Sequence, residues 1–323
     1  MKNIQEFEQF YNISLKTDLA NLDLRRKRIV KRFLILTFFI FIPIVAASVL
    51  LQIYMNISNI AFIGPAVAIV IALLVFTFWV RDKLFYNDFK SQVINRIVYF
   101  ISPELQYNSN GSVNVSEFVT SRLFLTNVDR YKGDDLVFGK IDKTAFRFSE
   151  IKAEYKTTNV SSKGNTRNTW HTLFKGLFFI ADFNKDFRGS TVVLPNSLGK
   201  RFNFLKKLMG ITRREKLIEL EDVNFTKHFN VYGDDQIQSR YILSISLINR
   251  ILEYKKKTDK HIYLSFVDSK MYLGIPYAKD LFEPSYLRSL TNFDLVKTYY
   301  EDMILVVCIV EDLNLNLRIW TKE

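Results

Sequence analysis

The sequence predicts an α+β fold: an N-terminal transmembrane helical hairpin with a helical stalk, followed by a cytoplasmic antiparallel-sheet domain with packed helices. Three observations support this prediction. Two long uncharged segments lie near the N-terminus, strand-like segments joined by short polar turns follow position 103, and helical apolar spacing returns in the last third. The chain of 323 residues is long enough for one large core or two modest ones.

The first 32 residues are predicted to form an amphipathic cytoplasmic helix, because apolar residues recur at steps of three or four. These residues are Ile4, Phe7, Tyr11, Leu15, Leu19 and Leu22. Similar spacing over residues 81–102 predicts a helical extension of the second uncharged segment. The two apolar stripes are expected to face each other or the globular domain, and self-association through them is the alternative.

Residues 33–54 and 60–80 carry no charged side chain. Each segment is about 21 residues long, or about 31 Å as a helix, which matches the ~30 Å hydrocarbon core of a bilayer. Buried core helices or a signal peptide are the alternatives. A signal peptide would begin closer to the N-terminus. Two transmembrane helices are therefore predicted.

Basic residues flank both segments and predict the topology. They are Arg25, Arg26, Lys27, Arg28, Lys31 and Arg32 before the first, and Arg81 and Lys83 after the second. The connection 55–59 is uncharged, so the positive-inside rule places both termini in the cytoplasm of a multi-pass membrane protein. The single Cys308 cannot form an internal disulfide and is interpreted as a small buried apolar residue.

The formal net charge of +12 includes a second basic group, in residues 199–216. Its members are Lys200, Arg201, Lys206, Lys207, Arg213, Arg214 and Lys216. Apolar residues lie between them, a pattern that suits either a segment resting on membrane lipids or a solvated loop that dips into the core. Nucleic acid is not a predicted partner, because there is no aromatic ladder or recognition-helix pattern.

Strands are predicted at 135–141, 144–157, 169–183 and 190–195, with a polar hairpin tip over 161–168. Because short polar turns join neighbouring segments, we expect an antiparallel meander.

Further along, residues 221–235 are predicted as a turn, a short strand and a second turn. A helix is predicted to begin after Ser244, and a hairpin over 261–276 to turn at 268–270. A long, largely buried helix is predicted to begin at Asn292.

Motifs for chemistry are absent from the sequence. His171, His228 and His261 have no metal-ligand spacing, and there is no phosphate-binding loop or nucleophile elbow, so no catalytic residue, metal or cofactor is predicted. The weak candidates for a site are Asp182, Lys185, Asp186 and Arg188. The two acids can meet around the bend and bind a cation. Ion pairing with Lys175, Lys185 and Arg188 is the favoured interpretation.

Four blocks together resemble the uncharacterised bacterial family called domain of unknown function 3137. They are FKGLFFIADFNKDFRGSTVVLP, FTKHFNVYGDDQIQSRYILS, LFEPSYLRSL and LNLNLRIW. The resemblance covers nearly the whole chain and implies an integral protein of the bacterial inner membrane, with no activity or cofactor to transfer. Genes of this family often lie beside those of LemA-type membrane proteins, which suggests a membrane partner.

The leading hypothesis is a membrane-anchored, non-enzymatic interaction or scaffold protein. The alternatives are an enzyme acting on a membrane-proximal substrate and, more weakly, an oligomeric channel or transporter subunit. No ionisable residue lies within either uncharged segment, so the usual mark of an ion pathway is missing. The stretch 174–189 is interpreted as a central strand followed by a turn, with Gly176 allowing a close backbone approach or a bulge.

Overall fold

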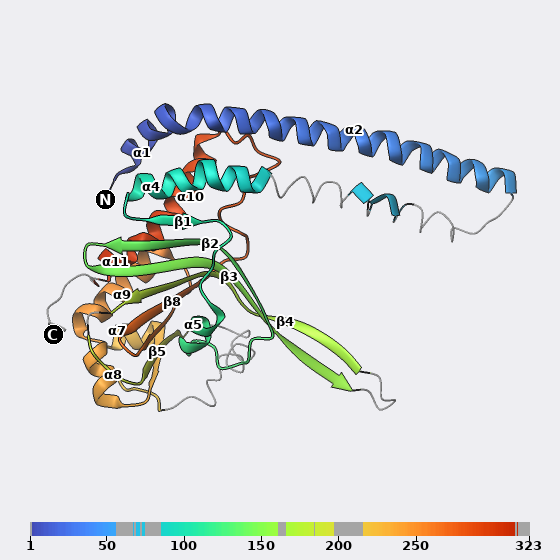
Figure 1. Ribbon diagram of the computed structural model, residues 1–323. Coiled ribbons are helices and arrows are strands. Elements are labelled where there is room, and N and C mark those ends of the chain that lie inside the picture. The colour runs from blue at the N-terminus through green and yellow to red at the C-terminus, as the bar shows by residue number, and fades with distance from the viewer. Residues whose placement is uncertain are drawn as a thin grey trace. The chain divides into compact units, whose positions relative to one another are not determined.

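The computed structural model describes residues 2–55, 67, 69–71, 73–74, 85–160, 166–183, 185–196, 216–313 and 315 (Figure 1). The chain divides into two compact units. One consists of Met1–Arg96 and Glu283–Thr298, and we call it the helical unit. The other consists of Ile97–Phe282 and Tyr299–Glu323, and we call it the sheet unit.

The N-terminal arm is helical from Ile4 onward. Helix α1 (Ile4–Phe10) continues through a π-helical turn (Tyr11–Leu15) into α2 (Lys16–Met55). The side chain of Asn3 caps α1 by accepting a hydrogen bond from the Glu6 N–H. Five of the six apolar positions that predict the amphipathic helix are buried, whereas Ile4 is 38% exposed.

A second helical arm, after the uncharged segments, is described from residue 85 onward. Residues 85–89 are helical and lead through a π-helical turn (Lys90–Ile94) into α4 (Asn95–Ile101). Phe85, Phe89 and Val93 are buried, as expected from their spacing. Ion pairs join the two arms: Arg25 contacts Asp88 at 2.6 Å, and Arg96 pairs with Asp18.

Residues 33–54, the first predicted span, form part of the continuous helix α2. Within the described part of the chain, none of the helices combines the length and the apolar character needed to traverse a bilayer. The second predicted span, 60–80, lies outside the described residues except for 67, 69–71 and 73–74, which are helical.

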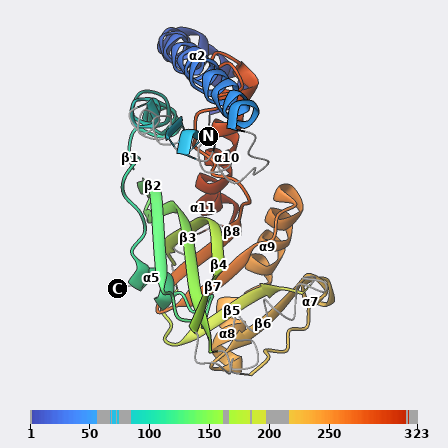
Figure 2. The ribbon, with the colours of Figure 1, turned by 90° about the vertical axis from the view of Figure 1, so that its right-hand side faces the viewer.

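The sheet unit is built on one eight-stranded antiparallel sheet, in the order β1-β2-β3-β4-β8-β7-β5-β6 (Figure 2). Its strands are β1 (Gln106–Asn108), β2 (Arg130–Ile141), β3 (Thr144–Val160), β4 (Thr166–Asp182), β5 (Ser190–Pro195), β6 (Phe229–Gly233), β7 (Tyr263–Val267) and β8 (Lys270–Pro276). The prediction of an antiparallel sheet is confirmed.

The expected meander is correct for β2, β3 and β4 and wrong for β5, and β1 was not predicted. The edge of β4 pairs with β8, and β5 lies beyond the β7–β8 hairpin. The connection between β4 and β5 therefore passes β8 and β7, so that β5 does not lie next to β4 in the sheet. Local turn chemistry does not encode which edge a strand will find, so the sequence pattern could not predict this order.

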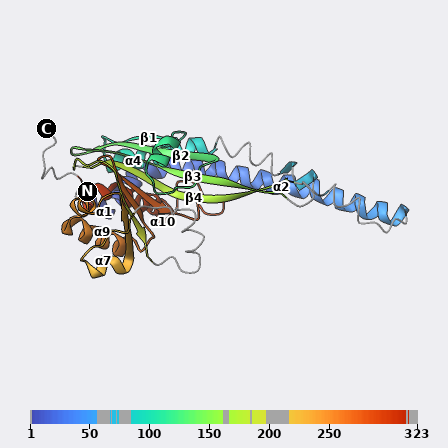
Figure 3. The same cartoon turned by 90° about the horizontal axis from the view of Figure 1, so that it is seen from below.

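Strand β4 is central and buried on both faces, as predicted. Phe178 packs against Phe118 at a ring-centroid distance of 5.0 Å, and Phe179, on the opposite face, stacks on Phe146 at 5.6 Å. Beyond their pairing with β2 and β8, β3 and β4 continue side by side as a ribbon (Figure 3). His171 stacks there on Tyr155, which agrees with a structural role.

Further helices are described between the strands and after them. They are α5 (Val115–Thr120), α7 (Val223–His228), α8 (Gln236–Ile242), α9 (Ile245–Thr258), α10 (Phe293–Val307, which crosses from one unit to the other in sequence) and α11 (Ile309–Asp312). The predictions for α9, the β7–β8 hairpin and α10 are confirmed. The prediction for 221–235 missed α7. The side chain of Asp222 caps this short helix by accepting a hydrogen bond from the Phe225 N–H.

Gly176 is predicted to be intolerant of substitution. Its φ of +152° and the 2.1 Å separation between an added Cβ and the Ile275 carbonyl oxygen leave no room for a side chain. We expect Gly176→Ala to lower the free energy of unfolding by about 2–3 kcal/mol, through backbone strain and displacement of β8. Thermal unfolding of the full chain, followed by circular dichroism, measures this.

Gly111→Ala is the matched control, because its added Cβ would come no closer than 3.0 Å to a side-chain atom of Asn108. Equal destabilisation by the two substitutions would contradict the close approach between β4 and β8.

Candidate functional site

Residues Glu283–Thr298 leave the sheet unit in sequence and belong to the helical unit. We call this segment the strap. It contains most of the block LFEPSYLRSL that contributes to the family resemblance. The strap contacts both helical arms through buried polar groups and aromatic rings, and this arm–strap junction is the candidate functional site of the helical unit.

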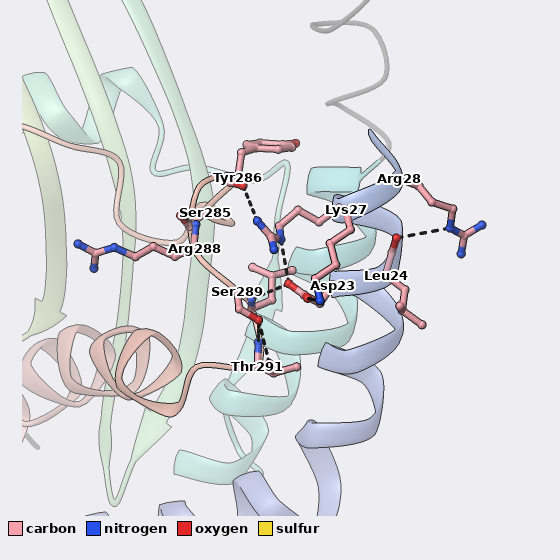
Figure 4. Close-up of polar contacts among 11 residues, drawn as sticks. Asp23, Leu24, Lys27, Arg28, Ser285, Tyr286, Arg288, Ser289 and Thr291 are labelled. Carbon is pink, nitrogen blue, oxygen red and sulfur yellow. Dashed lines mark hydrogen bonds and ion pairs between the residues drawn. The ribbon is translucent and has the colours of Figure 1, made fainter. Parts of the chain in front are cut away.

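Asp23 of α2 is the acceptor at the centre of the junction (Figure 4). Its side chain is only 5% exposed. One carboxylate oxygen accepts hydrogen bonds from Arg26 Nε at 2.8 Å and from the Leu290 N–H of the strap at 3.0 Å. The other lies 3.1 Å from Lys27 Nζ. Positions i, i+3 and i+4 share one face of a helix, which explains why these three side chains meet.

Arg26 connects α2 to the strap as a hydrogen-bond donor. Its guanidinium binds Asp23 and also donates to the Tyr286 carbonyl oxygen at 2.5 Å. With 10% of its side chain exposed, Arg26 is a buried charge that needs both partners. Removing one member of a buried ion pair typically costs about 3–5 kcal/mol, because the remaining charge is left unpaired.

The protonation of Asp23 follows from these contacts. Burial alone would raise the pKa of its carboxyl group, but hydrogen bonds from the Leu290 N–H, Arg26 and Lys27 outweigh burial and hold the pKa below its usual value. The stabilisation is therefore present above the pKa of Asp in the unfolded chain. It is lost as pH falls through the lower folded-state pKa.

Further contacts fasten the strap along its length. At its start, Glu283 lies 3.0 Å from Lys90 Nζ, whose side chain is 6% exposed. The Tyr286 ring lies 5.5 Å from the Phe85 ring. Near its end, the Tyr11 hydroxyl donates to the Thr291 carbonyl oxygen at 2.6 Å. The strap therefore contacts both arms and not α2 alone.

The sheet unit holds the residues that precede the strap. Glu150 of β3 accepts hydrogen bonds from the Leu281 and Phe282 N–H groups at 2.8 and 3.2 Å. Burial, followed by the charge of Asp135, raises the pKa of Glu150 to about 8. Asp135 is itself buried, at the β-bulge of β2, with a φ of +58° and a hydrogen bond from the Tyr107 hydroxyl.

The comparisons with known proteins concern part of this architecture. Residues 172–315 match the model of the family described as protein of unknown function (DUF3137). Over these residues the chain is similar to that family, which supports the resemblance seen in the sequence. The matched region includes β4, Leu281, Phe282 and the strap, and it does not include the uncharged segments 33–54 and 60–80.

No curated protein matches the chain. Among solved structures, it is similar to the crystal structure of the mycobacterial trehalose monomycolate transport factor A, TtfA. The sequence identity is 8%, the alignment covers 66% of this chain and 94% of that chain, and the TM-score is 0.34. This TM-score is too low to establish a shared fold.

Two blocks of the DUF3137 region meet in space. Asp234, from the block containing VYGDD, accepts from the Ser190 N–H at 2.7 Å, and Arg122 approaches it at 3.6 Å. Gly189 precedes Ser190 with a φ of +85°. Asp235 caps α8 by accepting from the Ile237 N–H. These acids therefore shape turns and a helix end, as the sequence predicts for YGDD.

The site candidates from the sequence have different partners: Lys185 contacts α8, and Asp186 contacts Ser269 in the β7–β8 turn. Lys185 Nζ lies 2.5 Å from the Tyr241 carbonyl oxygen and 4.7 Å from the Tyr241 ring centroid, and burial lowers its pKa. Asp186 accepts from the Ser269 hydroxyl at 3.3 Å, while Asp182 and Arg188 are exposed. Lys175 pairs with Asp280 at 2.9 Å. Lys185 thus contacts Tyr241 of α8, and its ion pairing with the two acids stays a prediction.

Most of the first basic group lies on the surface of α2. Arg25, Lys27, Arg28, Lys31 and Arg32 are exposed. Arg26 differs, because it is held in the buried junction, where its charge is neutralised by Asp23. Arg81 and Lys83 lie outside the described residues, as do Lys200, Arg201, Lys206, Lys207, Arg213 and Arg214. Lys216 is described and exposed, and its carbonyl oxygen accepts from the Gly233 N–H.

Cys308, which follows α10, is half-buried, so it is less buried than the sequence predicts. Burial raises the pKa of its thiol to about 11, and a thiol with so high a pKa is a poor nucleophile at neutral pH.

Asp23→Asn tests the arm–strap junction. The substitution leaves Arg26 buried without its carboxylate, and we expect the local stability of the strap to fall by about 3–5 kcal/mol. Hydrogen exchange measured by mass spectrometry on peptides from residues 283–298 should show markedly faster exchange, including the Leu290 amide.

Asp88→Asn is the matched control for Asp23→Asn. It removes the Arg25–Asp88 pair, which is about half exposed, and its expected cost is about 1 kcal/mol or less. Unchanged exchange of the strap in Asp23→Asn would contradict the role of this carboxylate.

The raised pKa of Glu150 predicts that the stability of the sheet unit depends on pH. Because its folded-state pKa is raised to about 8, its contribution to stability is fully present below the unfolded pKa of ~4.3 and is lost as pH rises through about 8. We expect the free energy of unfolding to fall by at least about 2 kcal/mol between pH 5 and pH 9. Urea unfolding followed by circular dichroism measures it.

Glu150→Gln keeps an oxygen that can accept from the Leu281 N–H and removes the titrating group, so this variant should show a clearly smaller fall. Glu104→Gln, at an exposed position, is the control and should behave as the wild type. An identical pH dependence in Glu150→Gln and the wild type would assign the effect to another group.

Proposed function

We propose that this protein is a membrane-anchored, non-enzymatic interaction protein. In this proposal, residues 33–54 and 60–80 insert as two helices into the bacterial inner membrane and present the sheet unit on the cytoplasmic side. The partner class is membrane lipid together with another membrane protein, for which the family resemblance suggests a LemA-type protein, or a second copy of the chain.

One observation carries the proposal. Helix α2 runs without interruption from Lys16 to Met55. The same helix therefore carries buried Leu19 and Leu22, the basic group 25–32 and the uncharged segment 33–54, in that order. A helix that is fastened to the strap at Asp23 and becomes uncharged seven residues after Arg26 is well suited to joining a folded unit to a bilayer.

The polar groups of the described residues favour interaction over catalysis. Asp23, Arg26, Lys90 and Glu150 hold the strap and the two residues before it, and Lys185 is engaged with α8. A general acid or base must reach a substrate, whereas these groups are satisfied by the protein itself.

Membrane attachment and partner capture are both measurable on the full chain. We expect the wild type to stay in the membrane pellet after an alkaline wash and, in mild detergent, to co-purify a membrane protein or lipid above background. Val45→Lys places a charge at the centre of the first segment at a cost of about 2.5–3.5 kcal/mol and should reduce retention.

Ile13→Lys is the control, because Ile13 is already 82% exposed on the arm. Release of the wild type by the wash would contradict the anchor, and a pulldown that recovers neither protein nor lipid above background would contradict the interaction role.

A further inference from the structure

The strap carries a fully exposed apolar side chain. Leu287 is 97% exposed, in contrast to Leu290, which is buried three residues later. The backbone on either side of Leu287 is held in place: the Tyr286 carbonyl oxygen binds Arg26, and the Leu290 N–H binds Asp23. The junction therefore holds an apolar side chain in solvent on a short segment whose backbone is fixed on both sides.

Basic side chains surround this part of the helical unit. Those that are exposed on α2 and on the strap are Arg25, Lys27, Arg28, Lys31, Arg32 and Arg288. In Figure 4, Arg28 and Arg288 point to opposite sides of the junction, with Lys27 between them. Arg25 and Lys27 pair with Asp88 and Asp23, and Arg28, Lys31, Arg32 and Arg288 add further exposed positive charge. This charge is complementary to an anionic surface.

The position of the junction along α2 gives the depth of Leu287. Arg26, which binds the Tyr286 carbonyl oxygen, precedes Phe33 by seven residues, or about 10 Å along the helix axis. The polar interface of a bilayer extends roughly 5–8 Å beyond the hydrocarbon on each side. A helix whose uncharged segment starts at the hydrocarbon boundary therefore places Arg26, and the segment with Leu287 that it binds, at the outer edge of the lipid headgroups, about 2–5 Å beyond the interface.

We propose that the turn Ser285–Arg288 is a lipid-docking site, in which Leu287 enters the interface of an anionic bilayer and the surrounding lysines and arginines contact lipid phosphates. This inference rests on the proposed membrane anchor and adds a specific contact surface to it. The Asp23–Arg26 pair acts as the positioning device, because it fixes the backbone that carries Leu287.

The test places an environment-sensitive nitrobenzoxadiazole probe on a cysteine at position 287. Cys308→Ala removes the native thiol, and Leu287→Cys or Ile13→Cys supplies the labelling site. Ile13 is a matched control: it is 82% exposed on the same unit, but lies 20 residues, or about 30 Å, before Phe33. The full chain is reconstituted in phosphatidylcholine vesicles with or without phosphatidylserine, and nitroxide lipids with shallow labels serve as quenchers.

We expect quenching in the anionic vesicles to be at least about twofold greater at position 287 than at position 13. It should decrease in neutral vesicles. Adding Asp23→Asn should lower it at position 287 without releasing the chain, because the strap is then no longer fixed to the arm.

Equal quenching at the two positions, with the chain retained after an alkaline wash, would overturn the docking site and leave the anchor intact. Quenching that is the same in neutral and anionic vesicles would overturn the role of the basic side chains. Release of the chain by the wash would overturn both the docking site and the anchor on which it rests.

Discussion

The helical unit depends on one buried ion pair whose partners come from distant parts of the sequence. Asp23 and Arg26 lie one turn apart on α2, yet neither is fully satisfied by the helix: the carboxylate also needs the Leu290 N–H, and the guanidinium also needs the Tyr286 carbonyl oxygen. Because a buried charge without a partner is strongly destabilising, the arm requires the strap. The strap in turn requires the arm, which satisfies its backbone groups.

The strap is bound within the helical unit, and the two residues just before it are bound within the sheet unit. Glu150 in the sheet unit fixes the N–H groups of Leu281 and Phe282, and Lys90 in the helical unit pairs with Glu283. The block LFEPSYLRSL is therefore a connector whose polar contacts are distributed over both units.

Much of the fold was predictable because it depends on local patterns. Buried positions on both faces of β4, the capped start of α10 and the apolar stripes of the two arms all follow from residue periodicity. Other features were not predictable. The pairing of β4 with β8 and the burial of Arg26 against the strap depend on neighbours that are distant in the sequence. The six basic residues between positions 25 and 32 look alike in the sequence, and only the structure shows that Arg26 is buried against Asp23.

The sequence by itself determined the α+β class, the central strand with its turn to Gly189, and the order of buried stripe, basic group and uncharged segment along α2. These features depend on side-chain periodicity and on charge, which are properties of neighbouring residues. Only the tertiary structure decided that residues 283–298 join the N-terminal arms and that Leu287 is held in solvent. The physical reason is that buried hydrogen bonds between residues more than 250 positions apart leave no periodic signal in the chain.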